Sequence, residues 1–288
     1  MPWTSPATTE ASSRPNGTCL KAGVAIPETT DRWRRQELLV PSTDPNVKMK
    51  TSLLLPPGAG PYRLAVINHG TTESGELRAQ YAEPEFEVVS SWLLARHYAV
   101  ALPQRPGHGE TGGPYLESAG GCEDAHYEEA GYGAANSIEA AGGYFLRQPY
   151  VKKERVLLVG HSAGAWGALA LASRNAGLVK GVINFSGGRG GRAYGIAGRN
   201  CAPDRLVSAA ATYGRSTRVP SLWLYSVNDT YFGPDLSKRM ADAFASAGGP
   251  VTYRLLPPMD ADGHYLIYSP GAARDWSAIV DEFLAMLR

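Results

Sequence analysis

Residues 155–164 read RVLLVGHSAG, and this stretch decides the fold. Its apolar part, 155–160, is short and ends at a turn, which predicts a strand rather than a helix. The following segment, 163–173, consists of good helix formers with small residues that allow close packing on a sheet. Ser162 is therefore expected on a sharp strand-to-helix turn, with glycines on both sides where side chains would collide with backbone. Such a turn exposes a serine hydroxyl for nucleophilic attack, although a glycine-bounded turn with a capping serine is the alternative.

The alternation of strand and helix continues outward from this stretch in both directions. We expect strands at 35–40, 47–55, 63–70, 98–103, 155–160, 181–187, 221–226 and 251–256. We expect helices at about 84–97, 124–148, 163–173, 234–247 and 271–287. The order predicts a doubly wound, mostly parallel eight-stranded sheet with helices on both faces and an antiparallel edge hairpin at its start. Active residues should gather at the carboxyl ends of the strands.

The chain of 288 residues, 43% of them hydrophobic, can build a sizeable core. We expect one domain over 35–288 and a flexible N-terminal arm over 1–34, because the first 18 residues are mostly Pro, Ser, Thr and small polar types. Residues 188–219 lie between two expected strands and are rich in Gly and Arg. A segment of this length predicts a lid or binding insertion.

The charge balance points to a small-molecule ligand. With 28 Lys and Arg against 27 Asp and Glu, the formal net charge is +1, which favours neither nucleic acid nor an anionic membrane as partner. The sequence contains no run of about 18 apolar residues, so it predicts no membrane-spanning helix. The N-terminus lacks the features of a secretory signal, which indicates a cytoplasmic protein unless a leader has been removed, so the compartment stays open, as does the oligomeric state.

Several motifs occur in the order typical of one known family. NHG stands at 68–70, RPGHGET at 105–111, GHSAG at 160–164, NDTYF at 228–232 and DGH at 262–264. From about residue 35 to 288 the chain resembles the α/β-hydrolase family, and within it most closely the dienelactone hydrolase and small prolyl-oligopeptidase-like esterase branch. It differs from the dienelactone hydrolases proper in having serine, not cysteine, at the elbow.

The family's chain order of nucleophile, acid and base implies the rest of a catalytic triad. Asp229 directly follows the strand 221–226 and is the expected acid. Its competitors are Asp204 and Asp235, within the insertion and the next helix, and Asp260 and Asp262, close to the histidine. His264 is the only histidine after His161 and is the expected base, which would take the Ser162 proton and return it to the leaving group.

An oxyanion hole requires two preorganised amide donors. One should be the backbone N–H of Ala163, the residue after the nucleophile. By resemblance to the family, the second is Thr71, which follows His-Gly, with Thr72 as the nearby alternative. His69 is expected to brace that loop rather than to titrate in the reaction.

Substrate-binding residues are suggested by aromatic and basic side chains near these loops. Tyr231, Phe232 and Tyr265 adjoin the acid and base, and Tyr194 lies in the insertion, so either an aromatic pocket or simple packing is expected. Arg189 and Arg192, like Arg199, could clamp a substrate carboxylate, or they could solvate a mobile lid. The sequence has no phosphate or dinucleotide loop and no cysteine pair with metal-ligand spacing, so it implies neither cofactor nor metal.

Three cysteines leave the redox state open. If the protein is exported, we expect a disulfide between Cys122 and Cys201, with Cys19 left over. Three reduced thiols in a cytosolic protein are the alternative.

The sequence therefore predicts a serine hydrolase that cleaves carboxylic esters of small molecules through an acyl-enzyme. A peptidase or amidase of the same fold is one alternative, weakened because oligopeptidase relatives carry a large additional N-terminal domain. A catalytically inactive scaffold used for binding is the other.

Overall fold

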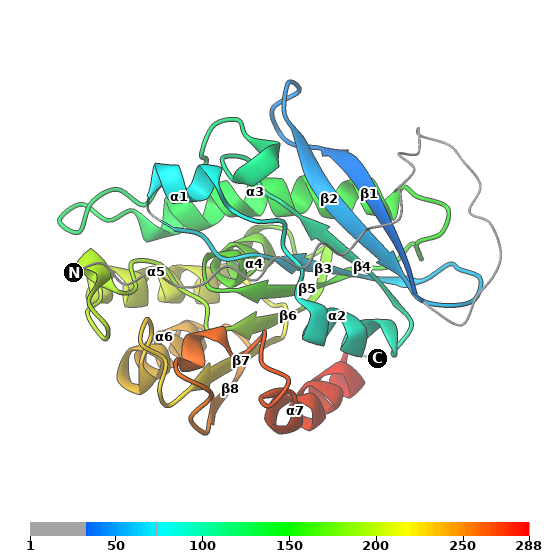
Figure 1. Cartoon of the computed structure of the whole chain (residues 1–288). Coiled ribbons are helices and arrows are strands. Elements are labelled where there is room, and N and C mark those ends of the chain that lie inside the picture. The colour runs from blue at the N-terminus through cyan, green and yellow to red at the C-terminus, as the bar shows by residue number, and fades with distance from the viewer. Residues whose placement is uncertain (1–32, 73, 288) are drawn as a thin grey trace, which may run out of the picture.

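The computed structural model describes residues 33–72 and 74–287, and Figure 1 shows them as one layered α/β structure. Nearly all of the N-terminal arm expected over 1–34 lies outside the described residues. The strands are β1 (Arg34–Pro41), β2 (Lys48–Leu55), β3 (Arg63–Asn68), β4 (Tyr98–Pro103), β5 (Val156–His161), β6 (Val179–Phe185), β7 (Ser221–Ser226) and β8 (Val251–Leu256).

These strands form one eight-stranded sheet in the order β1-β2-β4-β3-β5-β6-β7-β8. The first hairpin is antiparallel, β2 pairs antiparallel with β4, and every other neighbouring pair is parallel. The predicted doubly wound, mostly parallel sheet is thus confirmed. Because the chain order reverses around β3, the topological switch point lies between β3 and β5, and ligands bind outside the carboxyl ends of the strands at such a point.

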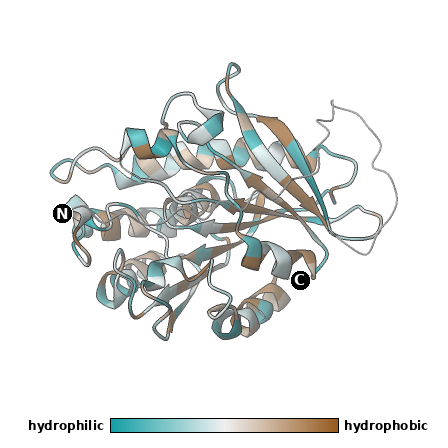
Figure 2. Ribbon diagram, in the orientation of Figure 1, coloured by the Kyte–Doolittle hydropathy of each residue, from teal (hydrophilic) through white to brown (hydrophobic). Residues whose placement is uncertain are grey.

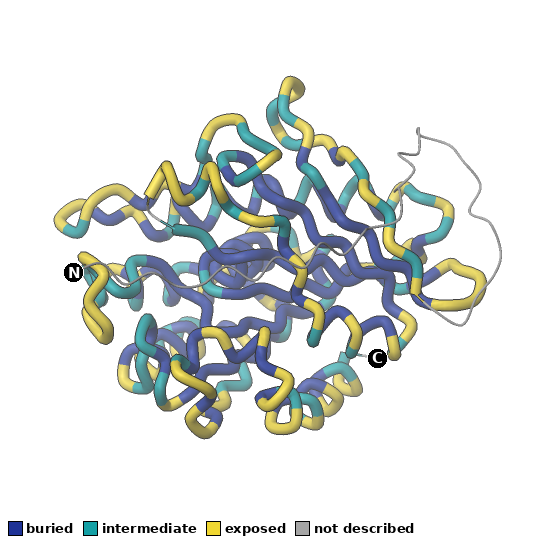
Figure 3. Tube along the Cα trace, viewed as in Figure 1, coloured by how far each residue is buried: buried dark blue, intermediate teal, exposed yellow. Residues whose placement is uncertain are grey.

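Alternate residues of the strands enter two separate cores, one on each face of the sheet. In β5, for example, Leu158 belongs to one core, and Leu157 and Val159 belong to the other. The hydropathy and burial views agree, because the central strands are predominantly brown in Figure 2 and dark blue in Figure 3. The continuous apolar runs of the sequence are therefore strands buried on both faces.

Helices cover both faces. The larger core packs under α3 (Tyr127–Leu146), α4 (Ala163–Arg174), α5 (Pro203–Ser216) and α6 (Pro234–Ser246). The other core packs under α2 (Glu87–Leu94) and α7 (Ala273–Met286). The short helix α1 (Gly75–Ala79) has no buried residue. Within the described part of the chain, no helix is long and apolar enough to cross a membrane.

The segment 188–219 has two structurally different parts. Its second half contains α5, whose Leu206, Ala210 and Tyr213 are fully buried in the larger core. These residues recur at helical spacing and bury one face of the helix against the sheet layer. A lid or binding role therefore applies only to the preceding residues, 188–202, and we call these the 188–202 loop.

Candidate active site

Ser162 occupies a strained turn at the carboxyl end of β5. Its φ of 53° and ψ of −124° lie outside the regions that non-glycine residues usually adopt, and its N–H donates to the carbonyl of Phe185 at 3.0 Å. The turn needs both neighbouring glycines. A Cβ on Gly160 would collide with the backbone of Ala165, and one on Gly164 would collide with backbone oxygens at the end of β3. The strand-turn-helix geometry expected of a nucleophile elbow is present.

Asp229 and His264 form a buried pair beside this turn. His264 Nδ1 lies 3.3 Å from Asp229 Oδ2, and the two residues are only 2% and 5% exposed. Asp229 Oδ1 also accepts from the backbone N–H groups of Tyr231, at 2.7 Å, and Phe232, at 2.8 Å. Burial alone would raise the pKa of Asp229, but the hydrogen bond and charge of His264 and the two amide donors outweigh it and lower that pKa. The carboxylate is therefore held ionised and aimed at the imidazole.

The other acid candidates have different partners. Asp262 Oδ1 accepts from the backbone N–H groups of Thr230 and His264, both at 3.0 Å, so it caps the short 3-10 helix η3 (Gly263–Tyr265). Asp204 is exposed and pairs with Arg239. Among these carboxylates, only Asp229 bonds the side chain of His264.

The ring of His264 is enclosed by aromatic side chains. Tyr231 stacks on it with centroids 3.9 Å apart, Phe232 lies at 5.6 Å, and Tyr265 approaches edge-on at 5.4 Å. The hydroxyls of Tyr231 and Tyr265 are 3.1 Å apart. Tyr265 is 46% exposed, whereas Phe232 is 1% exposed. Of the aromatic residues proposed from sequence, Tyr231 and Tyr265 border the site, and Phe232 is buried behind His264 in the core.

The loop after β3 is braced by His69, as expected. The Nδ1 of His69 bonds the carbonyl of Gly70 at 2.6 Å, and its Nε2 accepts from the backbone N–H of Arg105 at 3.0 Å. The first bond must be donated by Nδ1–H, so His69 is a neutral tautomer. Burial lowers the pKa of His69 well below its ordinary value, and the charge of Arg105 acts in the same direction. Because a trans peptide is planar, holding the Gly70 carbonyl also turns the N–H of Thr71 to the opposite side.

The side chain of Thr71 is held as well. Its Oγ1 lies 2.6 Å from His108 Nε2, and His108 Nδ1 lies 3.2 Å from the carbonyls of Arg105 and Pro106. Nδ1 therefore carries the proton, and Thr71 donates to Nε2. Burial lowers the pKa of His108 to about 4, which keeps it neutral at physiological pH. Thr71, proposed as an oxyanion donor, thus sits in a loop that is fixed on both sides.

Beneath this loop lies a fully buried ion triad, which we define as Arg105, Glu117 and Arg189. Arg105 makes a two-pronged contact with Glu117 through Nε and Nη2, the latter at 3.1 Å. Arg189 Nη1 lies 3.4 Å from the same carboxylate, and its Nη2 donates to the Glu117 carbonyl and, at 3.1 Å, to the Tyr115 hydroxyl. Burial would raise the pKa of Glu117, but the two guanidinium groups lower it. Arg189 is 3% exposed, so its charge is engaged within the protein and not presented to a substrate carboxylate.

The other residues of the 188–202 loop are more accessible. Arg192 lies over the Tyr231 ring at 5.4 Å and 3.8 Å from Asp262. Tyr194 is 76% exposed, and Arg199 lies over its ring at 5.0 Å. Of these three residues, Arg192 is the one that contacts an aromatic residue beside His264.

Cys122 and Cys201 form a disulfide, with their Cα atoms 4.9 Å apart. The bond ties the 188–202 loop to the segment before α3, and the Tyr127 hydroxyl also donates to the Cys201 carbonyl. Asn200 donates to the carbonyl of Tyr231, which connects the loop to the residue that stacks on His264. Cys19, the third cysteine, lies outside the described residues.

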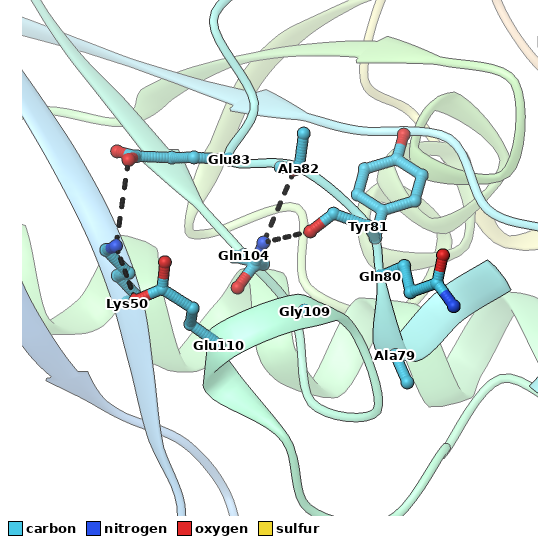
Figure 4. A pocket seen from close by; sticks show the side chains of 9 residues that line it. All are labelled: Lys50, Ala79, Gln80, Tyr81, Ala82, Glu83, Gln104, Gly109 and Glu110. Carbon is cyan, nitrogen blue, oxygen red and sulfur yellow. Dashed lines mark hydrogen bonds and ion pairs between the residues drawn. The ribbon is translucent and has the colours of Figure 1, made fainter. Parts of the chain in front are cut away.

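A separate cavity of about 300 Å³ lies between β2, the end of α1 with the residues that follow it, and the loop after β4 (Figure 4). In it, Lys50 lies between Glu83, at 3.8 Å, and Glu110, at 2.7 Å, so its ammonium group is paired with two carboxylates. Gln104 donates to the carbonyls of Tyr81 and Ala82. Tyr81, in the wall of this cavity, packs against His69 with ring centroids 5.0 Å apart and so supports the loop after β3. None of the candidate triad lines the cavity. Across the described ranges, no group of three or more His, Cys, Asp or Glu side chains is arranged to hold a metal ion.

The residues that support the loop after β3 were not predicted from the sequence. The RPGHGET motif, which contains Arg105 and His108, was the one available signal. No local pattern marks Tyr115 and Glu117, which follow this motif in the chain.

Comparisons with known proteins agree with this geometry. Residues 53–288 match the model of the Alpha/beta hydrolase family. No curated protein is significantly similar in sequence. Among solved structures, the Pyrococcus furiosus esterase Pf2001 superposes with a TM-score of 0.62 at 18% identity, over 92% of this chain and 98% of that one. A Klebsiella pneumoniae protein named as a candidate dienelactone hydrolase gives 0.59 at 16%, over 87% and 98%.

The Pyrococcus horikoshii acylaminoacyl peptidase gives a TM-score of 0.62 at 15% identity, over 88% of this chain but 41% of the peptidase. At these identities the superpositions report a shared fold. The family model spans most of the chain and includes the elbow and both members of the buried acid-base pair. The protein therefore belongs to the α/β-hydrolase family, among whose structurally similar members are esterases and peptidases.

Proposed function

We propose that the protein is a serine hydrolase that cleaves carboxylic esters through an acyl-enzyme on Ser162. The observation that carries this proposal is the strained elbow at Ser162 next to the buried Asp229–His264 pair. A lone serine hydroxyl is a weak nucleophile and needs a base oriented by a third group. Here the imidazole of His264 is oriented by a carboxylate whose pKa is lowered, so Asp229 is ionised at neutral pH and can hold the ring.

The reaction follows from these groups. His264 takes the Ser162 hydroxyl proton as Oγ attacks the ester carbonyl, and the resulting oxyanion accepts hydrogen bonds from the N–H groups of Ala163 and Thr71. The intermediate collapses, the bond to the alcohol oxygen breaks, and His264 gives that oxygen its proton. A water, deprotonated by His264, then attacks the acyl carbon and releases the acid and Ser162. Asp229 stays ionised throughout and stabilises the imidazolium.

Tyr231 and Tyr265 are proposed to border the substrate next to His264, with Arg192 and Tyr194 at the edge of the site on the 188–202 loop. Tyr265 is well exposed beside a catalytic group, as expected of a residue that contacts a small apolar substrate. Phe232 supports His264 from within the core. Arg189 supports Thr71 through Tyr115, whose hydroxyl accepts from Arg189 and lies 3.5 Å from Thr71 Oγ1.

The decisive experiment compares the native protein with Ser162→Ala on p-nitrophenyl acetate and butyrate and with a fluorophosphonate probe. The native protein should hydrolyse both esters and be labelled, and Ser162→Ala should lose labelling and about 10⁶-fold in kcat. Ser208→Ala, at an exposed serine, is the matched control. A native protein that neither hydrolyses nor labels would refute the proposal.

The acid is tested by Asp229→Asn against Asp204→Asn, an exposed carboxylate that was an alternative by sequence. The first should lower kcat by about 10⁴-fold, because the histidine tautomer is no longer set correctly, and the second should leave it unchanged. Equal rates in both variants would assign the role of acid to another group.

Amide hydrolysis is the second candidate, since one similar structure is a peptidase. That match covers 41% of the peptidase, whereas the esterase match covers 98% of the esterase, which favours the ester. Matched p-nitrophenyl esters and p-nitroanilides of one acyl group separate the two: faster turnover of the anilide would replace the ester proposal.

A further inference from the structure

His161, directly before the nucleophile, contacts both of the other catalytic loops. It is 4% exposed, and its Nε2 lies 2.9 Å from the backbone carbonyl of His264. On its other side, a Cβ placed on Gly70 would be 3.3 Å from His161 Nδ1, so the imidazole lies against the loop after β3. One side chain therefore connects the elbow, the base and the loop after β3.

The hydrogen bond fixes the tautomer of His161. A carbonyl oxygen only accepts, so Nε2 carries the proton and Nδ1 is bare. No group among the described residues bonds Nδ1, which is buried against the Gly70 backbone. Burial lowers the pKa of His161 to about 3, with the charge of His264 acting in the same direction and Asp229 opposing it. His161 therefore stays neutral when its neighbour His264, with ring centroids 4.8 Å away, takes up a proton.

The main chain of His264 depends on this contact. His264 lies in a three-residue 3-10 helix within a loop, so regular secondary structure holds it weakly. Its backbone N–H donates to Asp262 at 3.0 Å, and its carbonyl accepts from His161 at 2.9 Å. Both main-chain polar groups of His264 are thus held by side chains: Asp262 from its own loop holds the N–H, and His161 from the elbow holds the carbonyl.

We propose that His161 is a positioning residue that sets the distance between the base and the nucleophile by hydrogen-bonding the main chain of His264. The inference rests on the proposed function for its kinetic effect, but the hydrogen bond can be tested without activity. A catalytic group misplaced by about 1 Å costs on the order of 100-fold in rate, so one buried contact is enough to matter.

Two amide side chains separate the effect of the bond from that of the ring. In His161→Gln the side-chain NH₂ can reach the position of Nε2 and donate to the His264 carbonyl. In His161→Asn the NH₂ stops near the position of Nδ1, which is too short to make that bond. His161→Phe keeps a ring but has no donor, and His126→Gln, at an exposed histidine, is the control.

We expect kcat for p-nitrophenyl butyrate to fall about 10- to 100-fold in the Asn and Phe variants, with KM within about 3-fold, and to stay within about 5-fold of native in the Gln variant. Amide hydrogen exchange in the peptide around 262–266 should be faster in Asn than in Gln or native protein. Thermal unfolding checks that each variant is folded, and if Phe fails to fold, the Gln and Asn pair decides.

The outcomes are distinguishable. A native protein without esterase activity or probe labelling refutes the proposed function, and the exchange measurement still tests the bond. An active native protein whose Gln variant is as slow as Asn, or whose Asn variant matches native in rate and exchange, overturns the positioning role.

Discussion

The phenol ring of Tyr231 lies flat against the imidazole of His264, with centroids 3.9 Å apart and planes inclined by 21°. The backbone N–H of the same residue donates to Asp229 Oδ1 at 2.7 Å. Tyr231 therefore holds the acid through its main chain and the base through its side chain, which links the geometry of the two groups.

Replacing Tyr231 should separate these two contacts. Tyr231→Ala keeps the backbone bond but removes the ring, and because such aromatic pairs contribute about 0.5–1.5 kcal/mol, we expect kcat to fall by up to about 10-fold. Tyr231→Phe loses only the contact with Tyr265 and should remain close to native. Steady-state kinetics on one p-nitrophenyl ester checks both, with Tyr144→Ala, at a half-buried tyrosine of α3 outside the site, as control. Equal kcat in the Ala variant and native protein would show that the stack is dispensable.

The elbow should not tolerate a methyl group at Gly164. A Cβ there would collide with the backbone oxygens of Asn68 and His69, so Gly164→Ala must displace either α4 or the loop after β3. Such overpacking costs about 1–3 kcal/mol or more, and we expect a lower thermal midpoint together with loss of activity. Gly177→Ala is the control, because its Cβ would meet only Asn175 Oδ1 at 3.5 Å. An active, fully stable Gly164→Ala protein would contradict the tight packing.

Mild acid should destabilise the fold through three buried histidines, His69, His108 and His161. Burial lowers the pKa of all three, to about 4 for His108 and about 3 for His161, whereas unfolded histidines titrate near 6.5. Between about pH 6.5 and 4 the unfolded chain thus binds protons that the folded protein does not. The stabilisation should be fully present above this window, and the free energy of unfolding should fall by up to about 1.4 kcal/mol per pH unit for each histidine as the pH drops through it.

Urea unfolding at about pH 7.5, 6.5, 5.5 and 4.5 measures this slope. His108→Asn should reduce it by about a third, since one of the three contributions is removed. The carboxylates with lowered pKa, Asp229, Glu117 and Glu83, lose their stabilising effect mainly below about pH 5, so the slope between pH 6.5 and 5.5 reports the histidines. A free energy of unfolding that stays constant from pH 6.5 to 4.5 would rule out the neutral assignments.

Breaking the Cys122–Cys201 bond should lower stability. The bond spans a sequence separation of 79, and loop-closure entropy gives about 4 kcal/mol for a loop of this size. We expect the thermal midpoint to fall on reduction, and Cys122→Ser, Cys201→Ser and the double variant to be equally destabilised, because each removes the same bond. If reduced protein, verified by mass spectrometry, unfolds at the native midpoint, the bond contributes nothing.

The strands and the elbow were predictable because their signals are local. RVLLVGHSAG combines a doubly buried strand, a strained serine and a small-residue helix within a few residues, and the structure places β5 and α4 within one residue of the expected bounds. Helix α5 was missed although Leu206, Ala209, Ala210 and Tyr213 recur at helical spacing. Because the residues before α5 are rich in Gly and Arg, the whole segment 188–219 was predicted from the sequence as one insertion.

Contacts between distant loops had no local signal. Arg189 lies in a glycine-rich stretch that suggests exposure, but its partner Glu117 comes from 72 residues earlier in the chain. Phe232 similarly follows the acid in sequence, as a substrate contact would, but turns into the core instead. Which face of a loop a side chain takes depends on tertiary packing, which the residue pattern does not encode.

The buried ion triad has a consequence for how this protein can change over evolutionary time. Removing Glu117 leaves two buried guanidinium charges without a counter-ion, and breaking a buried ion pair in this way typically costs about 3–5 kcal/mol, whereas replacing a whole buried set by apolar residues is often neutral. Positions 105, 117 and 189 are therefore mutationally coupled: Glu117 can be lost at low cost only together with both arginines, whereas loss of one arginine leaves a balanced Arg–Glu pair. The order in which these three positions can change is thus restricted, and with it the sequence of the loops that hold Thr71 in place.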